Sequence, residues 1–129
     1  MCALTILVVD DDRDAATGLA NFLALDGHAV DVAYSGEAAI AKAASKDYDM
    51  ILLDVVLPGM NGFETMSVLR RADPSARVIL MSGYWGASLE DTTLDEDAVE
   101  VMPKPVDLDA LTGRMKDLAR AWHAAPGHA

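Results

Sequence analysis

The sequence predicts a doubly wound α/β domain, in which a five-stranded parallel sheet with the strand order 2-1-3-4-5 carries five helices. Apolar runs alternate with helical patterns along the whole chain, which is typical of stacked βαβ units. The first run is continuously apolar, as expected of a strand buried on both faces of a sheet. The 129 residues fit one domain, predicted over residues 1–123, with a short flexible tail at 124–129.

Five strands are expected where short apolar runs are bounded by polar or turn residues. They cover Leu4–Val9, Ala29–Tyr34, Asp49–Asp54, Arg77–Met81 and Val99–Met102. Right-handed crossovers leave few possible strand orders. In the order 2-1-3-4-5 the first and third strands lie side by side, at the point where the strand order reverses.

A helical pattern follows each of these strands. The expected helices are Arg13–Leu25, a second helix capped by Ser35, Phe63–Ala72, a short or mobile helix within Ser88–Asp97, and a last helix from its cap Asp107 to Trp122. Gly27 and Pro74 end the first and third helices, because each disfavours continued helix at its position. The Ser88–Asp97 segment is rich in carboxylates and poor in apolar residues, so its helix is expected to be weak.

The composition excludes several classes of function. A formal net charge of -11 argues against direct binding of nucleic acid or an anionic membrane. Cys2 is the only cysteine, so no internal disulfide and no thiolate metal site is expected. The first apolar run is too short for a signal peptide or a membrane span, which favours a cytoplasmic protein. The three histidines, His28, His123 and His128, are expected to be exposed and without a role.

Polar side chains of complementary chemistry end or follow four of the expected strands. Asp10 and Asp11 follow the first strand, Asp54 ends the third, and Ser82 and Lys104 follow the fourth and fifth. Parallel strands bring these residues to one edge of the sheet, where open α/β sheets bind ligands. Clustered carboxylates repel each other, and a bound Mg²⁺ or Mn²⁺, which takes oxygen ligands, would relieve this repulsion. Asp12 and Asp14 are instead expected to be solvated loop carboxylates, with Asp12 or Arg13 near the N-cap of the first helix.

The residues alone leave two roles open for Asp54. It could be only a metal ligand, or it could be a nucleophile that forms an aspartyl phosphate. A nucleophile needs partners for the phosphoryl oxygens, which the metal, the Lys104 ammonium and the Ser82 hydroxyl would supply. Loss of Lys104 is then expected to weaken signalling far more than folding, because an exposed lysine contributes little to stability.

Four motifs carry a family resemblance, and they occur in order between about Leu4 and Ala121. They are Val8-Val9-Asp10-Asp11, Leu53-Asp54 with Pro58-Gly59-Met60-Asn61-Gly62, Met81-Ser82-Gly83-Tyr84, and Lys104-Pro105. In combination they are highly specific. The chain resembles the receiver domain of bacterial two-component response regulators, and this resemblance implies a flavodoxin-like fold.

The resemblance also implies a role for each site residue. Asp54 would accept a phosphoryl group from a phosphohistidine, supplied by a sensor histidine kinase or a histidine phosphotransfer protein. Mg²⁺ would be bound directly by Asp11, Asp54 and the backbone carbonyl of Val56, and through water by Asp10. Ser82 would be the switch hydroxyl and Lys104 the phosphate-binding lysine.

One position departs from the family pattern. Receivers usually carry an aromatic residue on strand five, three residues before the lysine, and Val101 stands there in this chain. The usual coupling between the hydroxyl and an aromatic rotamer therefore has no partner at this position. Tyr84 or Trp85, which follow Ser82 closely, are the candidates to replace it.

The expected function is that of a single-domain response regulator, a phosphorylation-controlled switch that binds a downstream protein target. It is not expected to be an enzyme beyond its own phosphotransfer and dephosphorylation. The alternative is a small Mg²⁺-dependent phosphatase or phosphotransferase with an aspartyl nucleophile. Against that alternative, Val56 stands where a second acid would follow Asp54 by two residues. Dimerisation through the last helix, whose Trp122 would overrun the sheet, is a further hypothesis.

Overall fold

The computed structural model describes residues 3–73, 76–83, 101–104 and 106–124, with the backbone alone for 118–124. Five strands form one parallel sheet in the order β2-β1-β3-β4-β5. The strands are β1 (Thr5–Val9), β2 (Ala29–Ala33), β3 (Met50–Asp54), β4 (Val78–Ser82) and β5 (Val101–Pro103). The helices are α1 (Arg13–Leu25), α2 (Gly36–Ser45), α3 (Gly62–Ala72) and α5 (Leu108–Ala124). The predicted fold class and strand order are confirmed.

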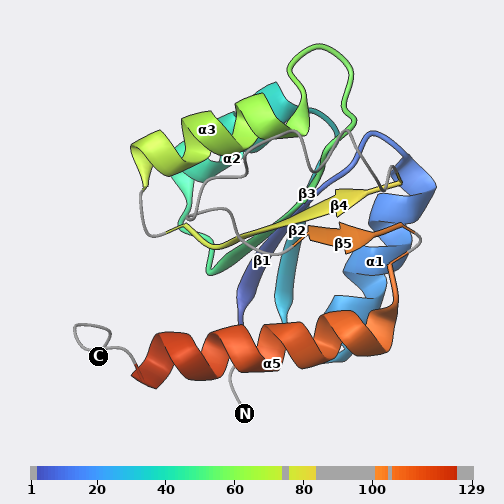
Figure 1. Cartoon of the computed structure of the whole chain (residues 1–129), viewed down its shortest axis with the longest axis vertical. Helices are drawn as coiled ribbons and strands as arrows, with labels where there is room; N and C mark the ends of the chain where they lie inside the picture. Colours follow the sequence, from blue (N-terminus) through green and yellow to red (C-terminus); the bar gives the residue numbers. More distant parts are fainter. Residues whose placement is uncertain (1–2, 74–75, 84–100, 105, 125–129) are drawn as a thin grey trace.

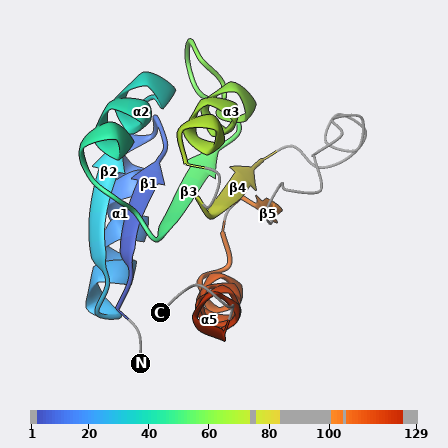
Figure 2. The same cartoon turned by 90° about the vertical axis from the view of Figure 1, so that its left-hand side faces the viewer.

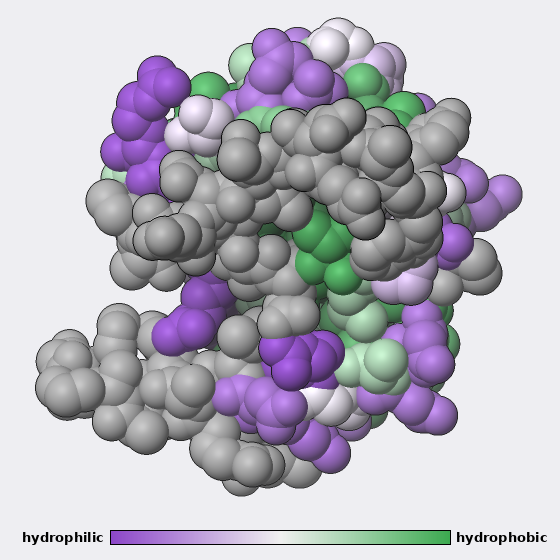
Figure 3. Space-filling view, viewed as in Figure 1, coloured by the Kyte–Doolittle hydropathy of each residue, from purple (hydrophilic) through white to green (hydrophobic). Residues whose placement is uncertain are grey.

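Helices cover both faces of the sheet, as Figures 1 and 2 show, with α1 and α5 on one side and α2 and α3 on the other. Successive strand residues point to opposite faces, so each strand supplies both layers. Ile6 and Val8 pack toward Leu23 and Leu111, whereas Leu7 and Val9 pack in the other layer, with Leu69. On the face shown in Figure 3, hydrophilic side chains gather over parts of α3 and over the first turns of α5, as expected of amphipathic helices on a buried sheet.

Side-chain caps fix where the helices begin. Asp12 accepts hydrogen bonds from the N–H groups of Asp14 and Ala15 at 3.1 and 3.2 Å, so of the two predicted candidates Asp12, and not Arg13, is the N-cap of α1. Ser35 caps α2 as predicted, and Asn61 forms a reciprocal capping box at the start of α3. α1 and α2 thus start directly after the short segments 10–12 and 34–35, whereas α3 starts after the longer loop 55–61.

The strands differ from their predicted bounds by a residue or so at their ends. β1, β3 and β4 begin one residue later than predicted, and β2 ends one residue earlier. β4 and β5 each end one residue later, because Ser82 and Pro103 are still paired in the parallel ladder. The predicted helix within Ser88–Asp97 and the aromatic pair Tyr84 and Trp85 lie outside the described residues. So does the predicted tail, apart from Ala124, which is the last residue of α5. None of the described helices is long and apolar enough to cross a membrane.

The prediction that His28 is exposed is wrong. Its side chain is only 10% exposed, and its Nδ1 accepts a hydrogen bond from the Leu4 N–H at 3.0 Å. The imidazole thus satisfies a backbone donor at the start of the first strand that would otherwise lack a partner. The role of His28 is structural, at the edge of the sheet opposite to the carboxylate motifs.

A polar network joins β2 to the loop between α2 and β3. Asp31 accepts hydrogen bonds from the Tyr48 hydroxyl at 2.7 Å and from the Lys46 ammonium at 2.9 Å. These hydrogen bonds, from Tyr48 first and then from Lys46, lower the pKa of Asp31. Burial, together with the hydrogen bond to Asp31, raises the pKa of Tyr48 above its ordinary value.

Replacement of Tyr48 by phenylalanine should lower the free energy of unfolding at pH 7 by about 0.5–1.5 kcal/mol, the usual contribution of one hydrogen bond. The folded state holds the phenol neutral, so this stabilisation is complete below the unfolded pKa of about 10 and is lost as the pH rises above it. The difference between wild type and Tyr48→Phe should therefore narrow above that pH. Urea unfolding of both proteins at pH 7 and above about pH 10 measures this difference in the free energy of unfolding.

Tyr34→Phe is the matched control, because no hydrogen bond of the Tyr34 hydroxyl is seen among the described residues. It should leave the free energy of unfolding within about 0.5 kcal/mol of wild type at pH 7. An equal loss in both variants would contradict a specific role for the bond between Tyr48 and Asp31.

Candidate functional site

Three carboxylates meet at the carboxyl edge of the sheet. β1 and β3 are direct neighbours, with Val9 opposite Leu53, so Asp10 and Asp54 emerge side by side. One carboxylate oxygen from each of Asp10, Asp11 and Asp54 lies within 4.8 Å of the other two. Asp10 is 3% exposed and Asp54 is 4% exposed, whereas Asp11 is exposed. The cluster therefore has a buried floor and one open side.

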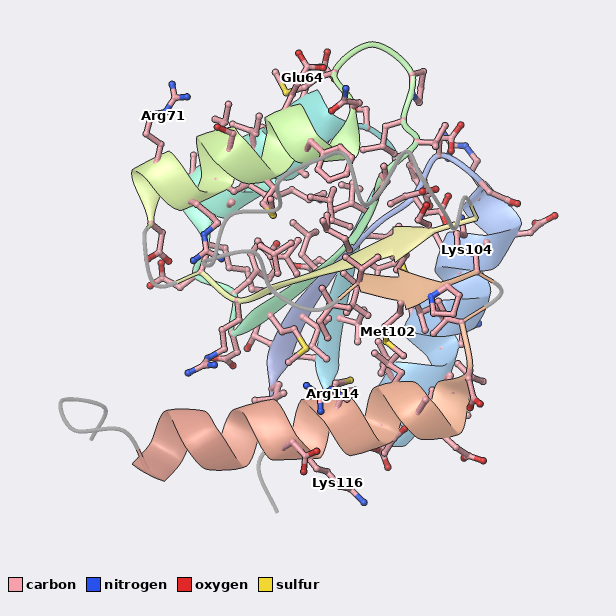
Figure 4. All side chains as sticks on the ribbon, in the orientation of Figure 1. Glu64, Arg71, Met102, Lys104, Arg114 and Lys116 are labelled. Carbon is pink, nitrogen blue, oxygen red and sulfur yellow. The ribbon has the colours of Figure 1, made fainter. Side chains whose placement is uncertain are left out.

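Lys104 reaches this cluster from β5 and neutralises its buried part. Its ammonium donates to Asp10 Oδ2 and to Asp54 Oδ2, each at 2.9 Å. Figure 4 shows Lys104 at the arrowhead end of the strands, near the beginning of α1. The side chain is 28% exposed, so the expectation of an exposed lysine that adds little to folding rests on a wrong premise.

The charges at the site shift one another's protonation. Burial raises the pKa of the Asp54 carboxyl above its ordinary value, although hydrogen bonds from Lys104 and from the Val56 N–H lower it. Burial lowers the pKa of Lys104, but the hydrogen bonds to Asp10 and Asp54 outweigh burial, so the pKa of Lys104 is raised. Lys104 thus stays charged at neutral pH, and the arrangement favours further positive charge beside Asp54.

The loop after β3 is shaped by a glycine that the sequence patterns did not single out. Gly62 lies so close to β3 that a Cβ there would clash with the Asp54 carbonyl oxygen and lie 2.6 Å from Val55 Cα. Its N–H donates to the Val55 carbonyl at 2.8 Å. Only glycine allows α3 to start this close to Asp54. The signal was present in the motif Asn61-Gly62, but it indicates packing only once the loop is folded.

Ser82 and Val56 flank Asp54 on neighbouring segments. Ser82 is fully buried at the end of β4, and its carbonyl accepts the Lys104 N–H at 2.8 Å. Val56 is 50% exposed, and its N–H donates to Asp54 Oδ1 at 3.1 Å. The structure thus brings both predicted residues to the carboxyl edge, although their roles there remain predictions.

Val101, at the position usually held by an aromatic residue, is half-buried. It packs against the layer formed with α2 and α3 and pairs with Leu80 in the ladder between β4 and β5. Its side chain is therefore part of the core on that face.

The donor atoms at the site fit a hard divalent cation. Every candidate ligand is an oxygen, and Asp10, Asp11 and Asp54 each bring one carboxylate oxygen within 4.8 Å of the other two. The predicted backbone ligand, the carbonyl of Val56, belongs to the adjoining loop. An oxygen-only set with one exposed carboxylate suits Mg²⁺, which keeps part of its water shell.

Comparison with known proteins identifies the family. Residues 6–116 match the response regulator receiver domain. The chain belongs to the response regulator receiver family. It is therefore a receiver domain of the two-component regulatory system type.

The receiver has similar relatives of known sequence and structure. It is 36% identical over 115 residues to the transcriptional regulatory protein TcrA of Mycobacterium tuberculosis, covering 89% of this chain and 46% of TcrA. It is 33% identical to the response regulator ArlR of Staphylococcus haemolyticus, covering 89% and 52%. The receiver thus spans about half the length of the curated relatives it matches.

Solved structures agree in fold. A two-component response regulator from Clostridium difficile is similar with a TM-score of 0.84 and 28% identity, covering 90% of this chain and 95% of that one. The response regulator TrrA from Thermotoga maritima, in complex with Mg²⁺ and BeF, has a TM-score of 0.80 and 32% identity, covering 88% and 97%.

Replacement of Lys104 by methionine should destabilise the metal-free protein by about 1–3 kcal/mol, because two buried carboxylates lose their hydrogen-bonded counter-charge. Saturating Mg²⁺ should recover part of this loss by supplying positive charge to the same oxygens. Urea unfolding with EDTA and with Mg²⁺ measures both effects. Lys116 is exposed, so Lys116→Met is the control and should change the free energy of unfolding little. Equal stability of the two variants in EDTA would contradict a stabilising role of Lys104 beside the buried carboxylates.

Proposed function

We propose that this receiver accepts a phosphoryl group on Asp54 in an Mg²⁺-dependent reaction and thereby switches its interactions with other proteins. The observation that carries this proposal is the environment of Asp54. Its buried carboxylate lies beside Asp10 and Asp11, and an ammonium is hydrogen-bonded to its Oδ2 at 2.9 Å. This arrangement combines a nucleophile, a cation site and a fixed positive charge at one point.

The transfer itself is a displacement at phosphorus. An oxygen of the Asp54 carboxylate forms a bond to phosphorus while the bond between phosphorus and the donor's imidazole nitrogen breaks, and the imidazole leaves with that electron pair. Asp10, Asp11, Asp54 and the Val56 carbonyl would hold Mg²⁺, which supplies positive charge to the phosphoryl oxygens when bound. We propose that Mn²⁺ can replace it, since it also takes oxygen ligands.

Lys104 and Ser82 have separate roles in this proposal. Lys104 contacts Asp54 Oδ2 directly, so its ammonium can follow the new charge onto a phosphoryl oxygen with little movement. Ser82 ends the strand next to β3 and would donate its hydroxyl to another phosphoryl oxygen. Both side chains would then respond to the state of Asp54.

The proposed donor is a phosphohistidine of a sensor histidine kinase or a histidine phosphotransfer protein, and the proposed output is a downstream protein target. The relatives named above are regulators, which supports this placement. The alternative is a phosphatase with an aspartyl nucleophile. The half-exposed Val56 offers no acid–base group two residues after Asp54, which favours the switch. Steady turnover of a phosphate ester by the purified chain would favour the phosphatase.

Acetyl phosphate with Mg²⁺ should add one phosphoryl group to the wild-type chain, on Asp54. The matched variant Asp54→Asn keeps the shape of the side chain and removes its nucleophilic charge, so it should fold and remain unlabelled. Intact-mass spectrometry after incubation measures the addition, and EDTA should abolish it. Full labelling of Asp54→Asn, or labelling insensitive to EDTA, would contradict the assignment.

We also propose that phosphorylation strengthens a homodimer through α5, whose first residue, Leu108, is 38% exposed. Sedimentation velocity with Mg²⁺ and beryllofluoride should show a larger species than Mg²⁺ alone. Asp54→Asn, which lacks the anionic carboxylate that beryllofluoride requires, should sediment identically in both solutions. A wild-type monomer under both conditions would contradict dimerisation and leave the phosphorylation result unaffected.

A further inference from the structure

Arg13 occupies an unusual position for a cation. It is the first residue of α1, directly after the N-cap Asp12, where the positive end of the helix dipole disfavours positive charge by about 0.3–1 kcal/mol. Its side chain is exposed, and its guanidinium carbon lies 4.1 Å from the centroid of the Tyr34 ring. No carboxylate within the described part of the chain forms an ion pair with it. An aromatic face rather than an anion holds this guanidinium.

Both members of this pair lie at the carboxylate edge. Tyr34 directly follows β2, whose last residue pairs with Val9, so Tyr34 is the cross-strand neighbour of Asp10. The N–H of Asp10 donates to the carbonyl of Ala33 at 3.1 Å, which ties the two chain segments together. The N–H of Asp12 donates to Asp10 Oδ1 at 3.0 Å, which fixes the turn that leads into Arg13. The backbone thus places Arg13 and Tyr34 on the β2 side of Asp10, whereas Lys104 reaches the cluster from β5, at the other edge of the sheet.

The net negative charge of the molecule makes the position of Arg13 important for an anion that approaches the site. A phosphoryl donor is an anion, and it must approach three carboxylates on a chain of net charge -11. Lys104 is already bonded to two of those carboxylates. The other cations whose side chains are described lie on α2, α3 and α5, in the loop after α2, or just before β4. They are Lys42, Lys46, Arg70, Arg71, Arg77, Arg114 and Lys116. Arg13 is therefore the exposed cation that the described part of the chain places at this edge.

We propose that Arg13, held over Tyr34, is a positioning residue that draws the anionic phosphoryl donor to the carboxylate edge and offsets the repulsion that the carboxylates exert on it. This inference rests on the proposed phosphorylation of Asp54 and names a residue that promotes it. The tyrosine ring holds the guanidinium without neutralising it, whereas a carboxylate partner would cancel the field that the donor meets. The same field disfavours a cation, so Arg13 should weaken Mg²⁺ binding while it speeds phosphorylation.

The decisive experiment compares Arg13→Ala with Arg71→Ala, a matched loss of an exposed arginine at the far end of α3 (Figure 4). Phosphorylation by acetyl phosphate is followed at about 0.01 M and about 0.1 M ionic strength, between which the screening length falls from about 30 to about 10 Å. Arg13→Ala should slow the second-order rate about 3–10-fold at low salt, and the difference from wild type should shrink at high salt. Arg71→Ala should match wild type at both.

A second measurement separates this inference from the proposed function. Mg²⁺ titration without a phosphoryl donor should show about 2–5-fold tighter binding to Arg13→Ala than to wild type. Tyr34→Leu keeps the charge of Arg13 but removes the ring that holds it, so this variant should be phosphorylated more slowly than wild type. Tyr34→Phe keeps the ring and should be phosphorylated at the wild-type rate. If wild type is phosphorylated but Arg13→Ala is phosphorylated at the same rate, the role of Arg13 is overturned. An Mg²⁺ affinity of Arg13→Ala equal to that of wild type would overturn it as well. A wild type that takes no label would instead overturn the phosphorylation of Asp54.

Discussion

One ammonium shared between two buried carboxylates is the interaction on which the rest of this site depends. Asp10 and Asp54 are nearly inaccessible, and burying two like charges side by side costs several kcal/mol unless a counter-charge is bound. Lys104 provides it from 94 and 50 residues away along the chain. The complete arrangement of carboxylates and ammonium therefore forms only when the ends of β1, β3 and β5 are all in place. Burial outweighs the hydrogen bonds from Lys104 and the Val56 N–H, so the pKa of Asp54 is raised.

The loops around the cluster are built to keep it compact. Asp10 Oδ1 accepts the Asp12 N–H, and Asp12 caps α1, so one short turn both orients a carboxylate and begins a helix. On the other side, Gly62 lets α3 start against the backbone of Asp54. Together they hold carboxylate oxygens from separate strands within 4.8 Å of one another, close enough to share one small hard cation.

Much of this arrangement followed from the sequence, because the signals are local. Asp10, Asp11 and Asp54 stand at the ends of buried apolar runs, and parallel pairing brings such positions together. The burial of Lys104 and its bond to Asp10 did not follow, because they depend on how far β5 reaches along β4. The continued pairing of Ser82 with Pro103 likewise needs the folded ladder. His28 was misjudged for the same reason, since its partner, the Leu4 N–H, is distant in sequence.

The link between Lys104 and Ser82 indicates how this receiver can work without an aromatic residue at position 101. Val101 is packed into the α2 and α3 layer, and its stiff, apolar side chain cannot report the state of the site by changing rotamer. The Lys104 N–H, however, donates to the Ser82 carbonyl, so the residue that contacts Asp54 and the residue that ends β4 share a backbone hydrogen bond. A phosphoryl group on Asp54, as proposed, would pull the Lys104 ammonium and the Ser82 hydroxyl toward the same oxygens. Because their backbones are joined, the ends of β4 and β5 would move as a unit, which would couple the state of Asp54 to that side of the sheet edge.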